Sequence, residues 1–474
     1  MKYILIWFFF LLPFHAFLIT FLKCRLGINT DIIRFWKEII LLWLFFYTIF
    51  FVLKRYKWKI SKIYEWNYIL WTITAFALVS LIYIVFPFFI LNFFDYLINK
   101  WWNFLDLAKD FLKTDKFKAW VLGYKYDVFF LFAVIIWYYL PFLRKNIRLY
   151  IKSTSSAILI ILWIFLPVYL FSDIQSFYSF FWYSSDVSTY NPNWCLTYSQ
   201  NVEWWHNRLQ TTFWWPIRFS VFLTVFYFLY LWLVLSSKKI KEDKKKYMIL
   251  IFSFLYFTAL FFSYTKTAFL WFFIWFLIFS YFTYTKVFHK IITKKFLSLS
   301  LFLFSLPIIL ILSLKRDLFL HIWAMLNRLE NLKISLEMFF YNPIWHWLWI
   351  AWPASQLWKI INYDSPEQSI YFSEKVHKFL PENWYVQILL EQWILWLWLF
   401  IWILSVLWVY LYRIMINKKD YLSIWFFSAF IALIFMANFT HAFEESATSY
   451  LFFLLIWAYI WENLKRKNKL KKSF

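Results

Sequence analysis

Long apolar runs alternate with short charged segments along almost the whole chain. Most runs reach roughly 17 residues or more, the length at which an α-helix begins to span the hydrocarbon of a bilayer. The pattern predicts an all-α, polytopic integral membrane protein with about 12 transmembrane helices. We expect the spans near 3–22, 36–53, 67–91, 127–143, 155–171, 214–235, 247–263, 267–284, 296–313, 385–412, 421–439 and 446–461.

Composition supports this class of protein. Hydrophobic residues make up 64% of the 474 positions, and the mean hydropathy is +0.60. The loops on one side are short and basic, and no Walker-type phosphate loop occurs in the sequence. We therefore expect residues 1–474 to form a single membrane domain. Its largest loop, 315–383, joins the ninth and tenth spans.

The net charge of +24 is distributed unevenly between the two sides of this topology. Alternate loops together with Lys2 carry 29 of the 49 lysines and arginines, whereas 20 of the 25 acidic residues fall on the other side. The positive-inside rule then predicts a cytoplasmic (inner) membrane protein with both termini in the cytoplasm. The basic loops are too short for a nucleic-acid-binding domain, so we expect the bilayer, and no nucleic acid, as their partner.

Metal and redox signals are weak. Cys24 and Cys195 both fall on the outer side, and two lone cysteines are expected to stay unpaired more often than they form a disulfide. The sequence has no CxxC motif and no histidine pair at helical ligand spacing, so we expect no metal site and no cofactor. Ionisable residues are scarce within the spans, which argues against an ion-coupled pump.

Tryptophan occurs 35 times and glycine only twice, whereas average usage near 7% predicts about 33 glycines. The hypothesis that explains both counts is a recoded gene, in which UGA means glycine but is translated here as tryptophan. Trp271 and Trp275 would then form a GxxxG helix contact. The alternative is a membrane protein rich in tryptophan, which gathers at membrane interfaces.

Four polar segments stand at the predicted outer ends of the spans. They are HNRLQTTFWWPIRF (206–219), SYTKTAFLW (263–271), FFYNPIWHWLWIAWP (339–353) and PENWYVQILLEQWILWLWLF (381–400). With glycine in place of tryptophan, the third reads N-P-I-G-H-G-L-G-I-A-G-P. The fourth then has glycines at Trp393, Trp396 and Trp398.

In this order, the segments resemble the O-antigen ligase/polymerase family of membrane glycan transferases. The resemblance covers a core of about 200–410, which includes the outer loop 315–383, and it depends on the Trp-to-Gly substitution. It implies a glycosyltransferase that moves a polyprenyl-diphosphate-linked glycan to a glycan, lipid or protein acceptor outside the cytoplasmic membrane. Such a reaction needs cations at the leaving diphosphate and a base for the acceptor hydroxyl.

The resemblance assigns the catalytic candidates. Arg208 is the expected diphosphate clamp, because a guanidinium binds phosphate oxygens in a fork; the other interpretation is an arginine that snorkels at the membrane edge. Lys266 stands where the family usually has arginine, and it keeps the charge but loses the bidentate geometry. Glu382 occupies the usual position of a histidine and is the candidate base. His346 and His441 are the alternatives.

Four further residues are candidates for contact with the substrate. Asn383, Tyr385 and Gln387 are expected to position the loop or the sugar, and the other interpretation of these three is helix capping and packing. Arg328 lies on an expected outer-loop helix, where it contacts either glycan or solvent.

Two rival functions remain open. A lipid-glycan flippase or exporter would need polar groups deep in several spans, and the spans are too apolar to favour it. A non-catalytic membrane scaffold for envelope assembly would not need cations on the outer face. The sequence does not separate a ligase from a polymerase.

Overall fold

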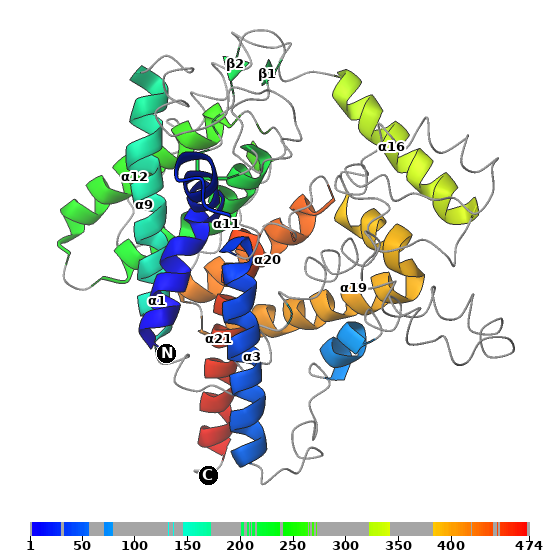
Figure 1. Cartoon of the computed structure of the whole chain (residues 1–474). Helices are drawn as coiled ribbons and strands as arrows, with labels where there is room; N and C mark the ends of the chain where they lie inside the picture. Colours follow the sequence, from blue (N-terminus) through cyan, green and yellow to red (C-terminus); the bar gives the residue numbers. More distant parts are fainter. Residues whose placement is uncertain are drawn as a thin grey trace, which may run out of the picture.

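The computed structural model is a helical assembly in which segments far apart in the sequence pack together (Figure 1). The structure describes ten segments longer than five residues and ten shorter pieces. These are 2–29, 33–55, 71–78, 146–171, 216–237, 240–263, 322–341, 383–418, 420–438 and 446–471, with 131, 136, 201–202, 206–207, 209, 211–213, 265, 268–269, 272 and 443.

The first predicted span, 3–22, is a helical rod with a change of geometry in its middle. It consists of α1 (Lys2–Leu11), a 3₁₀ turn η1 (Leu12–Phe14), α2 (His15–Thr20) and a π-helical end η2 (Phe21–Arg25). Pro13 has no amide hydrogen and lies at the start of the 3₁₀ turn, so the α-helical pattern is interrupted there.

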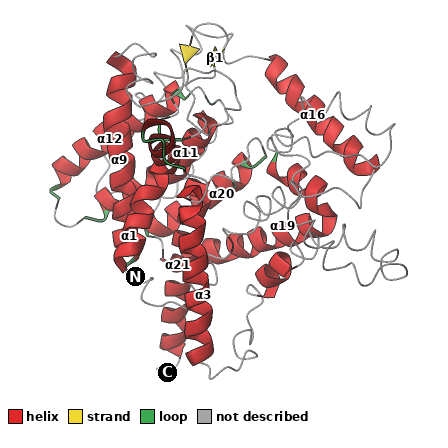
Figure 2. Ribbon diagram, in the orientation of Figure 1, coloured by secondary structure: helices red, strands yellow, loops and turns green. Residues whose placement is uncertain are grey.

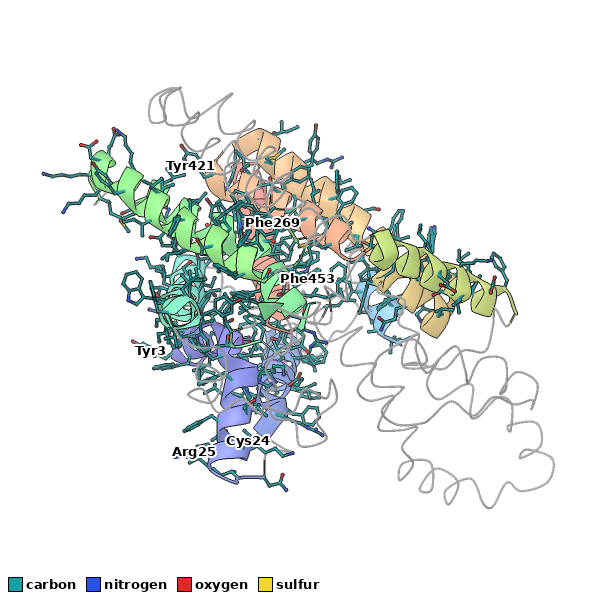
Figure 3. The ribbon with its side chains drawn as sticks, turned by 90° about the horizontal axis from the view of Figure 1, so that it is seen from above. Tyr3, Cys24, Arg25, Phe269, Tyr421 and Phe453 are labelled. Carbon is teal, nitrogen blue, oxygen red and sulfur yellow. The ribbon has the colours of Figure 1, made fainter. Side chains whose placement is uncertain are left out.

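Cys24, near the end of this rod (Figure 3), is disulfide-bonded. The expectation of unpaired cysteines is therefore wrong. Cys195 is the other cysteine of the chain. Both residues fall on the same predicted side of the membrane, so the topology places no bilayer between them.

In the part of the chain that the structure describes, the helices that follow the rod include three elements. They are η3 (Ile33–Phe35), α3 (Trp36–Arg55) and α9 (Ile147–Phe171). α9 runs parallel to the N-terminal rod: the Ser153 hydroxyl donates to the Ile6 carbonyl at 2.6 Å, and the Phe17 and Phe165 rings lie 6.0 Å apart farther along. Two in-to-out spans are expected to run parallel, so this packing agrees with the predicted alternation.

The centre of the core is formed by α11 (Pro216–Leu235), which is buried on nearly all sides. Proline at its first position suits a helix start, where the missing amide hydrogen has no partner to lose. α12 (Glu242–Phe262) returns antiparallel to it, and the Tyr227 and Ser253 hydroxyls meet at 2.6 Å.

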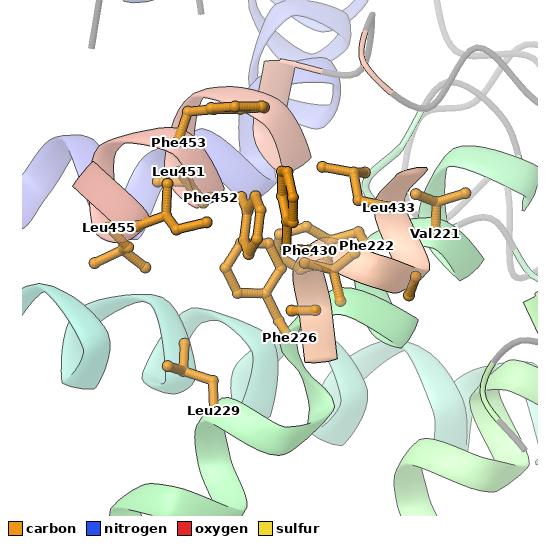
Figure 4. Packing of buried hydrophobic residues seen from close by; sticks show 14 of the residues in the cluster. Val221, Phe222, Phe226, Leu229, Phe430, Leu433, Leu451, Phe452, Phe453 and Leu455 are labelled. Carbon is orange, nitrogen blue, oxygen red and sulfur yellow. The ribbon is translucent and has the colours of Figure 1, made fainter. Parts of the chain in front are cut away.

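The C-terminal region contains α19 (Trp384–Lys418), α20 (Tyr421–Met436) and α21 (Ser446–Lys471). The Trp425 indole N–H donates to the Val225 carbonyl at 3.1 Å, which links α20 to α11 in the middle of both helices. Figure 4 shows side chains of α11, α20 and α21 interlocked in one apolar cluster, with Val221 near Leu433.

Two elements lie apart from this core. α16 (Ile322–Tyr341) packs against α19 and leaves Leu329 and Phe340 exposed (Figure 1). The strands β1 (Asn201–Val202) and β2 (His206–Asn207) form a two-residue antiparallel pair, with Val202 opposite His206. The described structure is otherwise helical, as predicted (Figure 2).

Five described helical segments are long and apolar enough to cross a membrane: Lys2–Arg25, Ile147–Phe171, Ile217–Leu235, Glu242–Phe262 and Ile394–Lys418. The chain is therefore a helical membrane protein. Tyr421–Met436 and Ala447–Ile460 are shorter apolar helices. The predicted spans 267–284 and 296–313, and most of 67–91 and 127–143, lie outside the described residues, so the count of about 12 remains a prediction.

Candidate functional site

The charged candidates themselves are not among the side chains that the structure describes. Arg208, Lys266, Glu382, His346 and His441 lie outside the described residues. Arg328 lies on α16, as expected for an outer-loop helix, but its side chain is not described. Described residues lie within two positions of four of them, Arg208, Lys266, Glu382 and His441.

A main-chain hydrogen bond joins the first polar segment to the residue directly before the second. The Leu209 N–H donates to the Phe262 carbonyl at 2.8 Å. Leu209 directly follows Arg208, and Phe262 is the last residue of α12, four positions before Lys266. The structure therefore brings the residue after Arg208 to the end of α12, four residues before Lys266.

A strained turn follows Leu209. Thr211 is 1% exposed and has φ = 51°, in the left-handed region that β-branched residues rarely adopt. The Thr212 hydroxyl donates to the Pro13 carbonyl at 2.7 Å, so this turn is fastened to η1. Such backbone strain costs about 1–3 kcal/mol, and it persists where the surrounding structure holds a segment in one shape.

The fourth polar segment is joined to the end of α20 in a similar way. The Trp384 N–H donates to the Ala437 carbonyl at 2.8 Å, and the Tyr385 hydroxyl donates to the Ile434 carbonyl at 2.9 Å. Trp384 lies two residues after Glu382, whereas Ala437 lies four residues before His441. These bonds bring the backbones near two candidate bases to one place.

Asn383 acts as the N-cap of α19. Its side-chain oxygen accepts from the amides of Tyr385 and Val386 at 3.0 and 3.1 Å, which satisfies two donors that a helix start otherwise leaves free. Gln387 is buried at 1% exposure, and its N–H donates to the Asn383 carbonyl at 3.0 Å. In this structure all three predicted substrate contacts, Asn383, Tyr385 and Gln387, help to build the helix start; sugar contact by them stays a prediction.

A phenol hydroxyl ordinarily ionises at about pH 10, well above neutral pH. The phenol therefore stays protonated at neutral pH and acts as a hydrogen-bond donor. Because that proton is committed to the Ile434 carbonyl, Tyr385 positions α19 against α20 and does not act as a base.

The two main-chain bonds, Leu209–Phe262 and Trp384–Ala437, lie at the same end of the helix bundle. α11 begins at Pro216, beside the first segment, and α12 runs antiparallel to it and ends at Phe262. The Trp425–Val225 bond and the place of Val221 near Leu433 (Figure 4) show that α20 is also antiparallel to α11. The end of α20 therefore points the same way as the start of α11.

A buried polar cluster lies in the same part of the fold, and sequence reasoning missed it. His15, Lys37 and Glu38 meet at the junction of α2 and α3. The available signal was the adjacent Lys-Glu pair at the start of the apolar run 36–53. Among the described residues, no group of three or more histidines, cysteines, aspartates or glutamates has the geometry of a metal site.

Comparison with known proteins identified no relative. No protein-family model matches the chain, and neither a curated protein nor a solved structure is similar to it.

Proposed function

We propose that the chain is a membrane glycosyltransferase of the O-antigen ligase/polymerase type. It moves a polyprenyl-diphosphate-linked oligosaccharide to a glycan, lipid or protein acceptor on the outer side of the cytoplasmic membrane. The observation that carries the proposal is the Leu209–Phe262 main-chain bond. It joins Leu209, next to Arg208, to Phe262, four residues before Lys266, although 52 residues lie between Leu209 and Phe262 in the sequence.

The second join supports the same assignment. The Trp384–Ala437 bond brings the segment after Glu382 to the segment before His441. Both joins lie at one end of the bundle. A transfer reaction needs its cations and its base at a common place, and a scaffold protein does not.

The mechanism follows from the charges that the reaction develops. The acceptor hydroxyl loses its proton to Glu382 while its oxygen attacks the anomeric carbon. The bond from that carbon to the diphosphate oxygen breaks, and the electron pair leaves with the diphosphate. Arg208 and Lys266 neutralise the negative charge that develops there. Arg208 holds phosphate oxygens in a fork, whereas Lys266 contributes a point charge.

The orientation of the chain is part of the proposal. The joined segments face the outer side, and both termini lie in the cytoplasm, as the positive-inside distribution predicts. The disulfide at Cys24 supports this orientation, because disulfides persist in the oxidising space outside the cytoplasm. The end of the first helix would then lie on the outer side.

The test is transfer of a labelled polyprenyl-diphosphate glycan by the purified, reconstituted chain. We expect Arg208→Ala to lower turnover by about 10²–10³, the usual effect of removing one group that stabilises transition-state charge. Arg413→Ala, an exposed arginine at the other end of α19, is the matched control and should leave turnover unchanged. Unchanged turnover in Arg208→Ala removes Arg208 from the mechanism. Movement of the intact lipid donor across the bilayer without transfer would favour a flippase.

A further inference from the structure

Five side chains form a polar cluster where the N-terminal rod, α3 and α21 meet. They are His15 of α2, Trp36, Lys37 and Glu38 of α3, and Tyr450 of α21. Lys37 and Glu38 are 3% and 4% exposed. Burying an ionisable pair in a membrane protein is costly, and such groups usually mark a functional site.

The contacts of His15 fix the protonation of its partners. The Trp36 indole N–H can only donate, and it donates to His15 Nδ1 at 3.0 Å. Nδ1 therefore carries no proton. A neutral imidazole has one N–H, so Nε2 carries it and must donate to whatever it meets. The atom that Nε2 meets is the Lys37 Nζ.

Lys37 can accept this hydrogen bond only as an uncharged amine, because an ammonium group has donors and no acceptor. The contact of Lys37 with Glu38 favours the charged ammonium state instead. Lys37 Nζ lies 3.6 Å from Glu38 Oε1, and the Tyr450 hydroxyl donates to the same oxygen at 3.5 Å. An ion pair with Glu38 requires the ammonium. The two contacts of Lys37 thus favour states that differ by one proton.

We propose that His15, Lys37 and Glu38 form a buried proton-binding site with two arrangements. Without the additional proton, Lys37 is an amine that accepts from His15. When Lys37 Nζ takes up a proton from solvent, the N–H of His15 and the new ammonium oppose each other. The ammonium then releases His15 and pairs with the Glu38 carboxylate. No bond other than these hydrogen bonds forms or breaks.

The charges on neighbouring elements favour a site whose state can change. Arg34 of η3, whose Nε is buried, adds a permanent positive charge beside α2. On the rod itself, Lys23 and Arg25 lie at the end of η2. The charge of Arg34 opposes protonation of Lys37, whereas the Glu38 carboxylate, 3.6 Å away, favours it.

The site is connected to the strained turn of the candidate functional site. His15 lies two residues after Pro13, whose carbonyl accepts from Thr212. Loss of the His15–Lys37 contact would therefore remove one of the links between α2 and α3 directly beside the η1 turn and leave the Trp36–His15 bond as another. The inference holds whichever reaction the chain performs, because it depends on the contacts of Lys37 alone.

The experiment is nuclear magnetic resonance of the full chain in detergent, with lysine labelled by ¹⁵N at Nζ. We expect one lysine to convert from ammonium to amine within roughly pH 5–10, the range over which buried lysines titrate. Lys37→Met should remove that signal. Lys333→Met, at an exposed lysine that pairs with Glu337 at 3.8 Å, is the matched control and should leave that signal in place.

Two variants should shift the pH at which this lysine converts from ammonium to amine, and they should shift it in opposite directions. Glu38→Gln removes the partner of the ammonium, so we expect conversion at a pH lower by about one to three units. His15→Phe removes the donor to the amine, so conversion should move to higher pH. The titration of the wild-type chain is itself a test of the proposal, so the experiment remains decisive even if Lys37→Met does not fold. A wild-type spectrum in which every lysine stays ammonium through this range overturns the proposal, as does a shift of both variants in the same direction.

Discussion

The identity of the tryptophans can be tested on α19, where two of them lie two residues apart in different surroundings. Trp396 is 7% exposed and belongs to the apolar core, whereas Trp398 is 58% exposed. We predict that both are glycine in the organism. Two versions of the chain are compared, one synthesised with tryptophan at all 35 positions and one with glycine at all 35. In the first, Trp396 or Trp398 is changed to glycine. In the second, tryptophan is restored at one of these two positions.

The burial of the two side chains sets the magnitude. Removing a buried tryptophan side chain costs about 3–5 kcal/mol, and glycine within a helix costs about 1 kcal/mol relative to alanine. If tryptophan is native, Trp396→Gly should lower the free energy of unfolding by about 4–6 kcal/mol. Trp398→Gly should then lower it by only about 1 kcal/mol. Under recoding, the all-glycine chain folds, and an indole at 396 destabilises it by forcing neighbouring helices apart.

The assay is reversible unfolding in mixed detergent micelles, together with the intact mass of the protein from its own organism. Each exchanged residue lowers the mass by about 129 Da because glycine has no side chain, which amounts to about 4.5 kDa for 35 residues. A native mass equal to the 59.3 kDa of the printed sequence would refute recoding, and with it the family resemblance. A large loss for Trp396→Gly beside a small one for Trp398→Gly would agree with that outcome.

Three smaller perturbations test the joins at the candidate site. Asn383→Ala should lower the free energy of unfolding by about 1 kcal/mol because two capping bonds are lost, whereas Asn383→Asp keeps an acceptor and should have little effect; equal losses would contradict the cap. Thr212→Val should cost about 1–2 kcal/mol, measured in the same way, because it leaves the Pro13 carbonyl unsatisfied, and Thr212→Ser should restore most of it. Reductant should lower wild-type stability by about 2–4 kcal/mol and leave Cys24→Ser unaffected, and a response in both would exclude the disulfide as the cause.

Hydropathy predicted the described spans well because their side chains are apolar over most of their length, both where they pack in the core and where they lie exposed. It missed their ends. The runs 155–171 and 446–461 correspond to α9 and α21, which continue to Ile147 and Lys471 through polar and basic residues. A helix can extend beyond the apolar part of its sequence, since backbone hydrogen bonds continue in solvent. The break at Pro13 was readable from the residue type, yet the apolar run on both sides concealed it.

The site was only partly predictable for a different reason. Motif order suggested which segments belong together, but not which atoms join them, because main-chain bonds such as Leu209–Phe262 leave no trace in residue type. The same limit applies to Lys37 and Glu38. Adjacent opposite charges usually indicate a solvated helix end, and only their burial beside His15 reveals another role.

The two joins between peptide groups have a practical consequence for anyone who reads or alters this gene. Replacing one side chain by another leaves the amide hydrogen and the carbonyl oxygen in the chain, so the main-chain bonds at Leu209 and Trp384 depend on packing and not on a particular side-chain donor. Proline is the exception, because its ring occupies the nitrogen. Library designs at these two buried points should therefore exclude proline to keep the main-chain bonds and stay within apolar residues of similar size to keep the packing.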